Sequence, residues 1–485
     1  MTGLDMLPPE QRRLFIGGKW RDAGEGETFD VLDPADGSVL TPVADGTVGD
    51  AVDALDAAVG AQAGWAATPP RERGEILRRA FEAINDRADD LALLMSLEMG
   101  KTVKEAKGEV AYGNEFFRWY AEEAVRIHGR WMQAPAGGSR LLTIKKPVGP
   151  CLFVTPWNFP IAMGTRKIGP AVAAGCTMVV KPAQQTPLTM LALAAILQEV
   201  GLPDGVLNIV PTTRAADLSK TLQADDRLRK VSFTGSTGIG RVMVRQSADQ
   251  LQRVSMELGG NAPFIVFDDA DLEAALDGAM VAKMRNAGEA CTAANRIYVQ
   301  SGIHDAFAEG LRKRMTALKV GAGVEAATEC GPMITKKAVD KIDRLVQNAV
   351  ARGARVLCGG SVGSETGFYY PPTVLCDVPA DAAIAQEEIF GPVAPISRFE
   401  QESEAIERAN DTEYGLAAYI YTRDLARGMR VAAKIEAGMI ALNRGLMSDP
   451  AAPFGGVKQS GIGREGGQGH GIAEFMEAKY LAVAM

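Results

Sequence analysis

This chain has no long hydrophobic run and no excess of positive charge. No stretch of about 18 apolar residues occurs, so we expect no membrane-spanning helix. The formal net charge is −8, which gives no broad electrostatic attraction for nucleic acid or for an anionic membrane. Residues 1–10 lack a basic region followed by an apolar core, so we expect no secretory signal and a location in the cytoplasm.

Cysteine and histidine are also sparse. The six cysteines are scattered along 485 residues without a Cys-x-x-Cys motif or a zinc-type pair, so we expect free thiols, a reducing compartment and no metal site. The three histidines, His128, His304 and His470, all lie far from Cys291 in sequence. A Cys-His catalytic pair at Cys291 would therefore require long-range folding.

The length and the hydrophobic pattern favour a multidomain α/β protein. A chain of 485 residues exceeds what one core usually supports, and 47% hydrophobic with 23% charged residues is typical of a soluble globular protein. Helical spacing of apolar residues predicts helices over 48–64 and 71–98. Beyond residue 150, short apolar runs alternate with helical segments, which predicts βαβ units and parallel sheets. The expected strands are 151–154, 177–180, 207–210 and 231–233, followed by a second set that begins at Phe264 and includes 296–299, 393–399, 418–421 and 439–442.

Two residues are candidates for nucleophilic chemistry: Glu257, between the two strand sets, and Cys291, within the second set. Cys291 lies among small residues that a substrate could approach, and a cysteine thiolate is a strong nucleophile. Glu257 precedes two glycines and a short apolar strand, and partial burial can raise a carboxyl pKa enough for general-base work near neutral pH. The alternative for Glu257 is a cap or a loop salt bridge. The change of strand set at 257–260 predicts a hinge between two α/β domains, with the catalytic groups at their junction.

Asn158 is the third candidate. It lies in Thr155-Pro-Trp-Asn-Phe-Pro, directly after an expected strand, and open α/β sheets bind ligands at the carboxyl ends of their strands. Its side-chain N–H could stabilise a developing oxyanion. Together with Glu257, Cys291 and the segment Glu388-Ile-Phe-Gly-Pro, this motif resembles the aldehyde dehydrogenase superfamily from about residue 12 to the C-terminus.

The resemblance implies a fold with three parts. We expect a Rossmann-type cofactor domain at 1–127 and 146–257, and a second α/β domain, the catalytic domain, at 258–450. A small β oligomerisation flap would comprise the arm at 128–145 and the C-terminal segment 451–485, in a homodimer or homotetramer. Within it, a hairpin at 133–139 would lead into a strand that pairs with the last residues of the chain. A plain surface hairpin is the alternative.

The same resemblance implies a nicotinamide cofactor. The turn Phe233-Thr-Gly-Ser-Thr-Gly-Ile-Gly follows a strand and opens a helix, where backbone N–H groups and the helix dipole favour a pyrophosphate. Its expected phosphate contacts are Gly235 and Ser236, and Lys181 would lie near the ribose of the adenosine end. Glu388 would hold the nicotinamide ribose with Phe390 packing nearby. The expected cofactor contacts also include Trp157, Leu258 and Gln184.

Gln184 departs from the pattern of the family. Members that strictly use NAD commonly carry a glutamate at this position, whose carboxylate accepts both ribose hydroxyls. A glutamine removes the repulsion against a 2′-phosphate while an amide can still bind a hydroxyl. The sequence therefore predicts that NADP is accepted, with NAD as a usable second cofactor.

Three residues, Arg166, Arg285 and Ser448, match positions that bind the substrate carboxylate in succinate-semialdehyde dehydrogenases, and a guanidinium binds a carboxylate in bidentate fashion. The implied reaction is the oxidation of succinate semialdehyde to succinate through a thiohemiacetal and a thioester on Cys291. Either arginine could instead pair with a neighbouring acid. Glutarate semialdehyde or a broad range of aldehydes remain alternative substrates, and a thiol esterase without a redox role is the alternative from another class.

Overall fold

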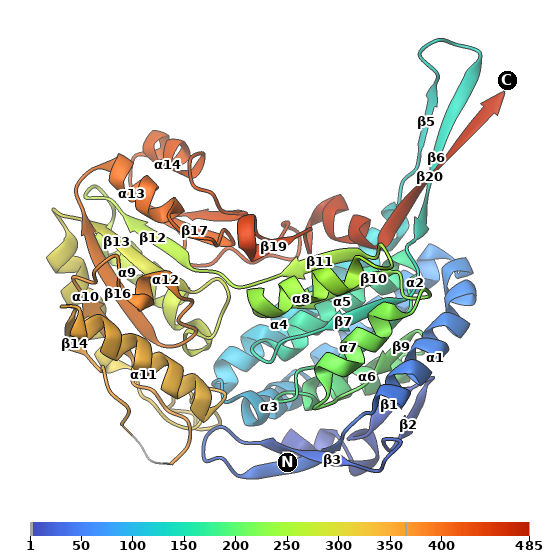
Figure 1. Ribbon diagram of the computed structural model, residues 1–485, viewed down its shortest axis with the longest axis horizontal. Coiled ribbons are helices and arrows are strands. Elements are labelled where there is room, and N and C mark those ends of the chain that lie inside the picture. Colours follow the sequence, from blue (N-terminus) through green and yellow to red (C-terminus); the bar gives the residue numbers. More distant parts are fainter. Residues whose placement is uncertain (1–2, 364–365, 485) are drawn as a thin grey trace.

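The computed structural model describes residues 3–363 and 366–484. Figure 1 shows two α/β lobes side by side, with a thin arm that projects from the lobe containing the N-terminal half of the chain. Each lobe is built on one large sheet, and the chain passes from the first sheet to the second at residues 257–262.

In the described part of the chain, the first sheet has eight strands in the order β19-β11-β10-β7-β8-β9-β1-β2. Its central strands, from β11 to β9, are parallel. The chain order runs outward in one direction from β7 and in the other from β10, so a topological switch point lies between these two strands. The strands are β1 (Leu14–Ile16), β2 (Lys19–Arg21), β7 (Cys151–Val154), β8 (Met178–Lys181), β9 (Leu207–Ile209), β10 (Lys230–Thr234), β11 (Arg253–Glu257) and β19 (Gly461–Ile462).

The second sheet, over the same described residues, has seven strands in the order β14-β15-β16-β13-β12-β17-β18. All neighbours are parallel except β14, which pairs antiparallel with β15 at the edge. The strands expected from the sequence are confirmed in both sheets, with small shifts at their ends. The strands of this sheet are β12 (Ala262–Val266), β13 (Ala294–Gln300), β14 (Arg355–Cys358), β15 (Thr373–Cys376), β16 (Val393–Phe399), β17 (Ala417–Tyr421) and β18 (Met439–Leu442).

Alternating side chains of each central strand pack against helices on opposite faces. In β7, Cys151 and Phe153 join the core formed with α2 to α6, whereas Leu152 and Val154 join the core formed with α1, α7 and α8. Burial on both faces explains why these strands are continuous apolar runs in the sequence. The helices of the first lobe are α1 (Val48–Ala67), α2 (Pro70–Asp86), α3 (Ala88–Met99), α4 (Val103–Glu123), α5 (Pro160–Ala174), α6 (Leu188–Glu199), α7 (Ala215–Ala224) and α8 (Thr237–Ser247). Those of the second lobe are α9 (Leu272–Met284), α10 (His304–Ala317), α11 (Lys336–Ala351), α12 (Ala383–Gln386), α13 (Glu402–Asn410) and α14 (Leu425–Ala432).

The helical pattern over 71–98 is divided into two helices, which the sequence did not indicate. Arg87, between α2 and α3, has φ −113° and ψ 17°, so the backbone leaves the helical region for one residue. Apolar spacing continues across this break, which is why periodicity alone suggested one unbroken segment. None of the described helices combines the length and apolar character needed to cross a bilayer.

The projecting arm is a three-stranded antiparallel sheet of β5 (Arg130–Gln133), β6 (Ser139–Pro147) and β20 (Met476–Ala484). The expected hairpin over 133–139 and its pairing with the end of the chain are confirmed. A further two-stranded sheet is formed by β3 (Thr28–Leu32) and β4 (Val39–Ala44). The division of the chain into cofactor, catalytic and oligomerisation domains remains a prediction.

Candidate active site

A cavity of about 270 Å³ opens at the carboxyl ends of β7 and β10, at the switch point of the first sheet. Its wall is completed by the crossing after β11 and by loops of the second lobe. The sequence predictions that meet on this wall are Trp157, Asn158, Gly235, Ser236, Glu257, Leu258, Cys291, Glu388 and Phe390. The fold therefore brings the three candidate catalytic residues together with most of the candidate cofactor contacts.

A second cavity, of about 230 Å³, adjoins the first. Phe159 lines both cavities. The second one is lined by Arg285 and Ser448, two of the three residues expected to bind a substrate carboxylate. The Phe159 side chain thus lies between the cavity of Cys291 and the cavity of the Arg285 guanidinium.

Asn158 is held by a buried network that joins three segments of the chain. Its backbone carbonyl accepts hydrogen bonds from Lys101 Nζ at 2.8 Å and from Asn286 Nδ2 at 3.0 Å. Its own Nδ2 donates to the carbonyl of Glu289 at 2.9 Å. An amide nitrogen carries two N–H groups, so one bond fixes the orientation and the second N–H is left for a ligand.

Lys101 forms a buried ion pair with Glu109 in α4, and both side chains are 1% exposed. A capping box of Thr102 and Glu105 fixes the start of α4 directly beside Lys101. The Glu109 carboxylate also accepts the N–H groups of Ile161 and Ala162, at the start of α5. The segment that carries Asn158 is therefore tied at its carbonyl and at the helix that follows it. We call Lys101, Glu109 and their contacts to the Asn158 segment the Asn158 junction.

The Cys291 loop has an unusual backbone path. Asn286 and Ala287 adopt φ of 57° and 51°, in the left-handed region that costs non-glycine residues free energy. Asn286 offsets this cost because its N–H donates to Glu105 Oε1 at 2.6 Å, in addition to its side-chain bond to Asn158. The carbonyl of Cys291 lies so close to Gly260 that a Cβ there would come within 2.4 Å of it. Only glycine allows this approach of the crossing segment to the nucleophile loop.

Burial sets the protonation of the candidate nucleophile and base. Burial, and next the carboxylates of Glu388 and Glu257, raises the pKa of the Cys291 thiol to about 12. Burial, followed by the carboxylate of Glu465, raises the pKa of Glu257 well above its ordinary value. Glu257 Oε2 is buried without a hydrogen-bond partner in the described residues. The Glu257 carboxyl is therefore not a cap or a surface salt bridge, and it is free to exchange a proton with a ligand.

The cofactor candidates surround an open helix end. Ser236 is the N-cap of α8 and makes no side-chain capping bond, so the first N–H groups of the helix keep their capacity to bind a phosphate. The N–H of Gly235, in contrast, already donates to the carbonyl of Glu257 at 3.0 Å. Trp157 and Phe390 meet edge to face at 5.4 Å. These groups fit a nicotinamide dinucleotide, with the anion at the helix end and aromatic rings beside the heterocycle.

Glu388, Lys181 and Gln184 complete the cofactor candidates. Glu388 Oε1 accepts the N–H of Gly260 at 3.2 Å, and burial raises its pKa to about 7. Lys181 ends β8 and is buried, which lowers its pKa to about 8. Gln184 is exposed in the loop that follows. Lys181 and Gln184 lie outside the cavity wall that Glu388 lines.

The two predicted substrate arginines differ in their surroundings. Arg166 is 1% exposed, faces Glu465 at 3.5 Å, donates to the Tyr112 hydroxyl and stacks on Phe454. Arg166 lines neither cavity. Tyr112 accepts its hydrogen bond and lines the second cavity, so Tyr112 stands between the guanidinium and that cavity. Arg285 stacks on Phe159 at 4.7 Å and forms no ion pair with any described residue.

The sequence did not indicate the residues that hold the site in place. Lys101, Glu109, Asn286 and Glu289 make their contacts across 52 to 131 positions of sequence. Only the capping box at Thr102 and Glu105 left a local signal. The other contacts join residues that are distant in sequence, so local sequence patterns could not predict them.

Comparison with known proteins gives a consistent result. Residues 20–481 match the model of the aldehyde dehydrogenase family. The chain is similar to a succinate-semialdehyde dehydrogenase of Paenarthrobacter nicotinovorans, at 55% identity over 92% of this chain and 99% of that protein. It is also similar to an NADP-dependent succinate-semialdehyde dehydrogenase of Escherichia coli, at 48% identity over 98% of both, and to a glutarate-semialdehyde dehydrogenase of Pseudomonas putida, at 49% identity over 98% of both. A crystal structure of an NADP-dependent enzyme of E. coli superposes with a TM-score of 0.97, at 47% identity over 99% of both chains.

The Asn158 junction predicts that removing one of its two charged partners lowers the stability of the fold more than removing both. Lys101→Met leaves the Glu109 carboxylate buried without its partner, so the free energy of unfolding should fall by about 3–5 kcal/mol. The double variant Lys101→Met/Glu109→Gln removes the lone charge and should recover part of that loss. Urea denaturation measures both. Arg78→Met, which breaks two exposed ion pairs on α2, with Glu75 and Glu82, is the control and should cost less than about 1 kcal/mol. Equal losses in Lys101→Met and Arg78→Met would contradict the role of the junction.

Proposed function

We propose that this chain, which belongs to the aldehyde dehydrogenase family, oxidises succinate semialdehyde to succinate with NADP and, less well, with NAD. The observation that carries the substrate assignment is Arg285. Its side chain lines the cavity next to that of Cys291 and forms no ion pair among the described residues. The two carboxylates of this cavity are held by other groups, Glu109 by Lys101 and Glu105 by the N–H of Asn286. A guanidinium without an ion-pair partner in such a place suits a carboxylate at the far end of the substrate.

The chain's own groups supply the covalent steps. The Cys291 thiol gives up its proton to solvent as Sγ adds to the aldehyde carbon, and the resulting oxyanion is stabilised by the free N–H of Asn158 Nδ2 and by the N–H of Cys291. The nicotinamide cofactor, when bound, accepts the hydride of this oxidation. Cys291 then carries the acyl group as a thioester, and Glu257 takes a proton from the water that hydrolyses it.

The cofactor proposal rests on the open end of α8 and on the loop after β8. The helix end favours the pyrophosphate, and Lys181, at the end of β8, would lie near the ribose of the adenosine end. Gln184 carries no charge to repel a 2′-phosphate. We assign Glu388 to the nicotinamide ribose, because its carboxylate lines the cavity beside Phe390.

Arg166 stands apart from the other two predicted substrate residues. Its guanidinium faces Glu465 as an ion pair and donates to Tyr112, and it lines neither cavity, so we assign the direct contacts to Arg285 and Ser448 and leave Arg166 behind Tyr112. Glutarate semialdehyde is the second candidate substrate, since one methylene changes binding by only about 1–3 kcal/mol and a similar glutarate-semialdehyde dehydrogenase is known.

We also propose that the chain forms a homodimer or a homotetramer in the cytoplasm. Large apolar side chains on the arm, Trp131, Met132 and Tyr480, are 60%, 48% and 58% exposed. Apolar groups on a projecting sheet suit burial against another subunit. The free thiols of the described residues suit a reducing compartment.

The substrate assignment is tested by initial rates of reduced-cofactor formation with succinate semialdehyde, glutarate semialdehyde and butyraldehyde. The wild type should prefer succinate semialdehyde over uncharged butyraldehyde by roughly a hundredfold in kcat/KM, because a charged hydrogen-bond pair contributes about 1.5–3 kcal/mol. Arg285→Leu should lose most of this preference and keep its rate with butyraldehyde. Arg314→Leu, a change in a half-buried arginine of α10 that lines neither cavity, serves as the control. Equal preference in wild type and Arg285→Leu would refute the carboxylate site, whereas ester hydrolysis without any oxidation would favour the thiol esterase.

The cofactor assignment is tested at two adjacent exposed glutamines. Gln184→Glu places a carboxylate near the expected 2′-phosphate and should raise KM for NADP by about tenfold, with little change for NAD. Gln185→Glu is the matched control, because it adds the same charge one residue away. An unchanged KM for NADP in Gln184→Glu would place the 2′-phosphate elsewhere.

The raised pKa of Glu257 predicts how the rate depends on pH. A raised pKa favours the protonated carboxyl up to a higher pH than for an ordinary glutamate, whereas the base must be the carboxylate. The fraction of carboxylate grows as the pH rises, so kcat should still increase with pH above the range in which an ordinary glutamate titrates. Rate profiles with saturating substrate and cofactor measure this. A flat profile would contradict the assignment of Glu257 as the base.

A further inference from the structure

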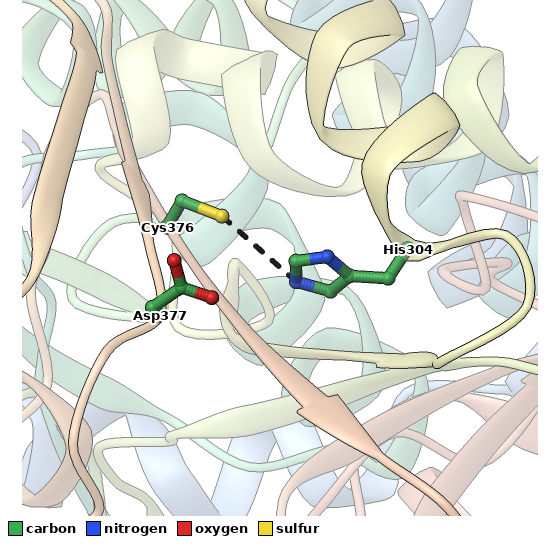
Figure 2. Close-up of side chains that lie close together, drawn as sticks. All are labelled: His304, Cys376 and Asp377. Carbon is green, nitrogen blue, oxygen red and sulfur yellow. Dashed lines mark hydrogen bonds between the residues drawn. The ribbon is translucent and has the colours of Figure 1, made fainter.

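A cluster of metal-ligating side chains lies in the second lobe, away from both cavities. Figure 2 shows His304, Cys376 and Asp377 with their side chains converging on one point. His304 begins α10, Cys376 ends β15, and Asp377 follows it. One ligand atom from each residue lies within 4.8 Å of the others. We propose that these three side chains form a binding site for a zinc ion.

The imidazole is already oriented as a metal ligand. His304 Nδ1 lies 2.8 Å from Asp305 Oδ1, a carboxylate that can only accept, so the proton is on Nδ1. The lone pair of Nε2 then faces the Cys376 Sγ, at 3.9 Å. A carboxylate behind the imidazole is the arrangement that fixes the tautomer of histidines bound to zinc.

The two buried ligand atoms, Cys376 Sγ and His304 Nε2, are near the separation of a tetrahedral site. Zinc binds sulfur at about 2.3 Å and nitrogen at about 2.0–2.1 Å, which places the two ligand atoms roughly 3.5 Å apart in a tetrahedron. The observed separation of 3.9 Å between Sγ and Nε2 exceeds this value only slightly. Small side-chain rotations would close the difference. A mixed set of thiolate, imidazole and carboxylate suits zinc better than calcium or magnesium, which prefer oxygen alone.

The burial of the three groups gives the site a closed side and an open side. His304 and Cys376 are 0% and 1% exposed, whereas the Asp377 side chain is 42% exposed. An ion could enter from the solvent side, past Asp377, and keep a water molecule as its fourth ligand. Asp377 adopts φ 57°, a left-handed conformation that a short polar residue tolerates better than most.

A Cys376 thiolate and the Asp377 carboxylate would balance the two positive charges of the ion. Arg355 contacts both groups, because its Nε holds Asp377 Oδ2 at 2.8 Å and its Nη2 donates to Cys376 Sγ at 3.6 Å. A bound ion would replace this guanidinium at the sulfur and take the other carboxylate oxygen. Asp305, the carboxylate behind the His304 ring, pairs with Arg398 at 2.8 Å, so the net charge of this pair is close to zero.

The site would link α10 to β15. Its ligands lie 72 positions apart, so a bound ion would close a long loop and add stability rather than take part in the oxidation. None of the three residues lines either cavity. The sequence predicted no metal site, because its cysteines show no zinc-type spacing and the ligands meet only in the fold.

Zinc titration of the full-length, chelator-treated chain in competition with a metal indicator tests the proposal. To remove binding at the active-site thiol, the titration is made in a Cys291→Ser chain. We expect saturation at about one zinc ion per chain. Adding Asp377→Asn should weaken binding by at least about tenfold, and Asp305→Asn should weaken it by about 10- to 100-fold. Asp381→Asn, an exposed aspartate four residues further on and also paired with an arginine, is the matched control and should bind like its parent.

Cobalt provides a readout of the sulfur ligand that does not depend on stability. A thiolate-to-cobalt absorption band should appear in the Cys291→Ser chain and disappear when Cys376→Ser is added. Zinc should also raise the Tm of Asp381→Asn but not that of Asp377→Asn. Absence of saturable binding, equal affinities of Asp377→Asn and Asp381→Asn, or a cobalt band that survives Cys376→Ser would each overturn the proposal.

Discussion

The buried ion pair of Lys101 and Glu109 is the interaction on which the geometry of the active site depends. Its ammonium holds the carbonyl of Asn158, and its carboxylate caps the start of α5, so the segment between β7 and α5 is fixed at Asn158 and at the helix that follows. Asn286 and Glu289 then join the Asn158 segment to the Cys291 loop of the second lobe. A buried pair is costly to break because the remaining charge cannot be solvated. The proposed oxyanion donor and the proposed nucleophile therefore keep their relative position through the interior of the protein and not through surface contacts.

The second constraint is the close crossing from the first sheet to the second. Glu257 ends β11, and Gly260 touches the carbonyl of Cys291 while its N–H is held by Glu388. The proposed base Glu257, nucleophile Cys291 and cofactor ligand Glu388 thus meet at one short crossing. Low polarity at this point raises the pKa of Cys291, Glu257 and Glu388 alike. Burial therefore disfavours the charged form of each group, and a ligand or a rise in pH shifts each toward it.

The sequence predicted the parts of this structure that local patterns encode. Apolar runs located the central strands because burial on both faces leaves no polar positions in them. The segments around Asn158, Glu257 and Cys291 identified the site because each follows or precedes a strand end. The break at Arg87 was missed, since apolar spacing continues across it. The sequence also could not distinguish Arg285 from Arg166, because the distinction depends on Glu465 and Tyr112, which are distant in the chain.

The proposed reaction depends on an acyl group carried by Cys291 and on a water molecule, activated by Glu257, that releases it. The most direct measurement is the intact mass of a Glu257→Gln chain after mixing with succinate semialdehyde and NADP. The account predicts a burst of about one equivalent of reduced cofactor per chain and a stable succinyl group on Cys291, because oxidation proceeds and hydrolysis does not. Continuous turnover at the wild-type rate, or a burst without any covalent adduct, would contradict it.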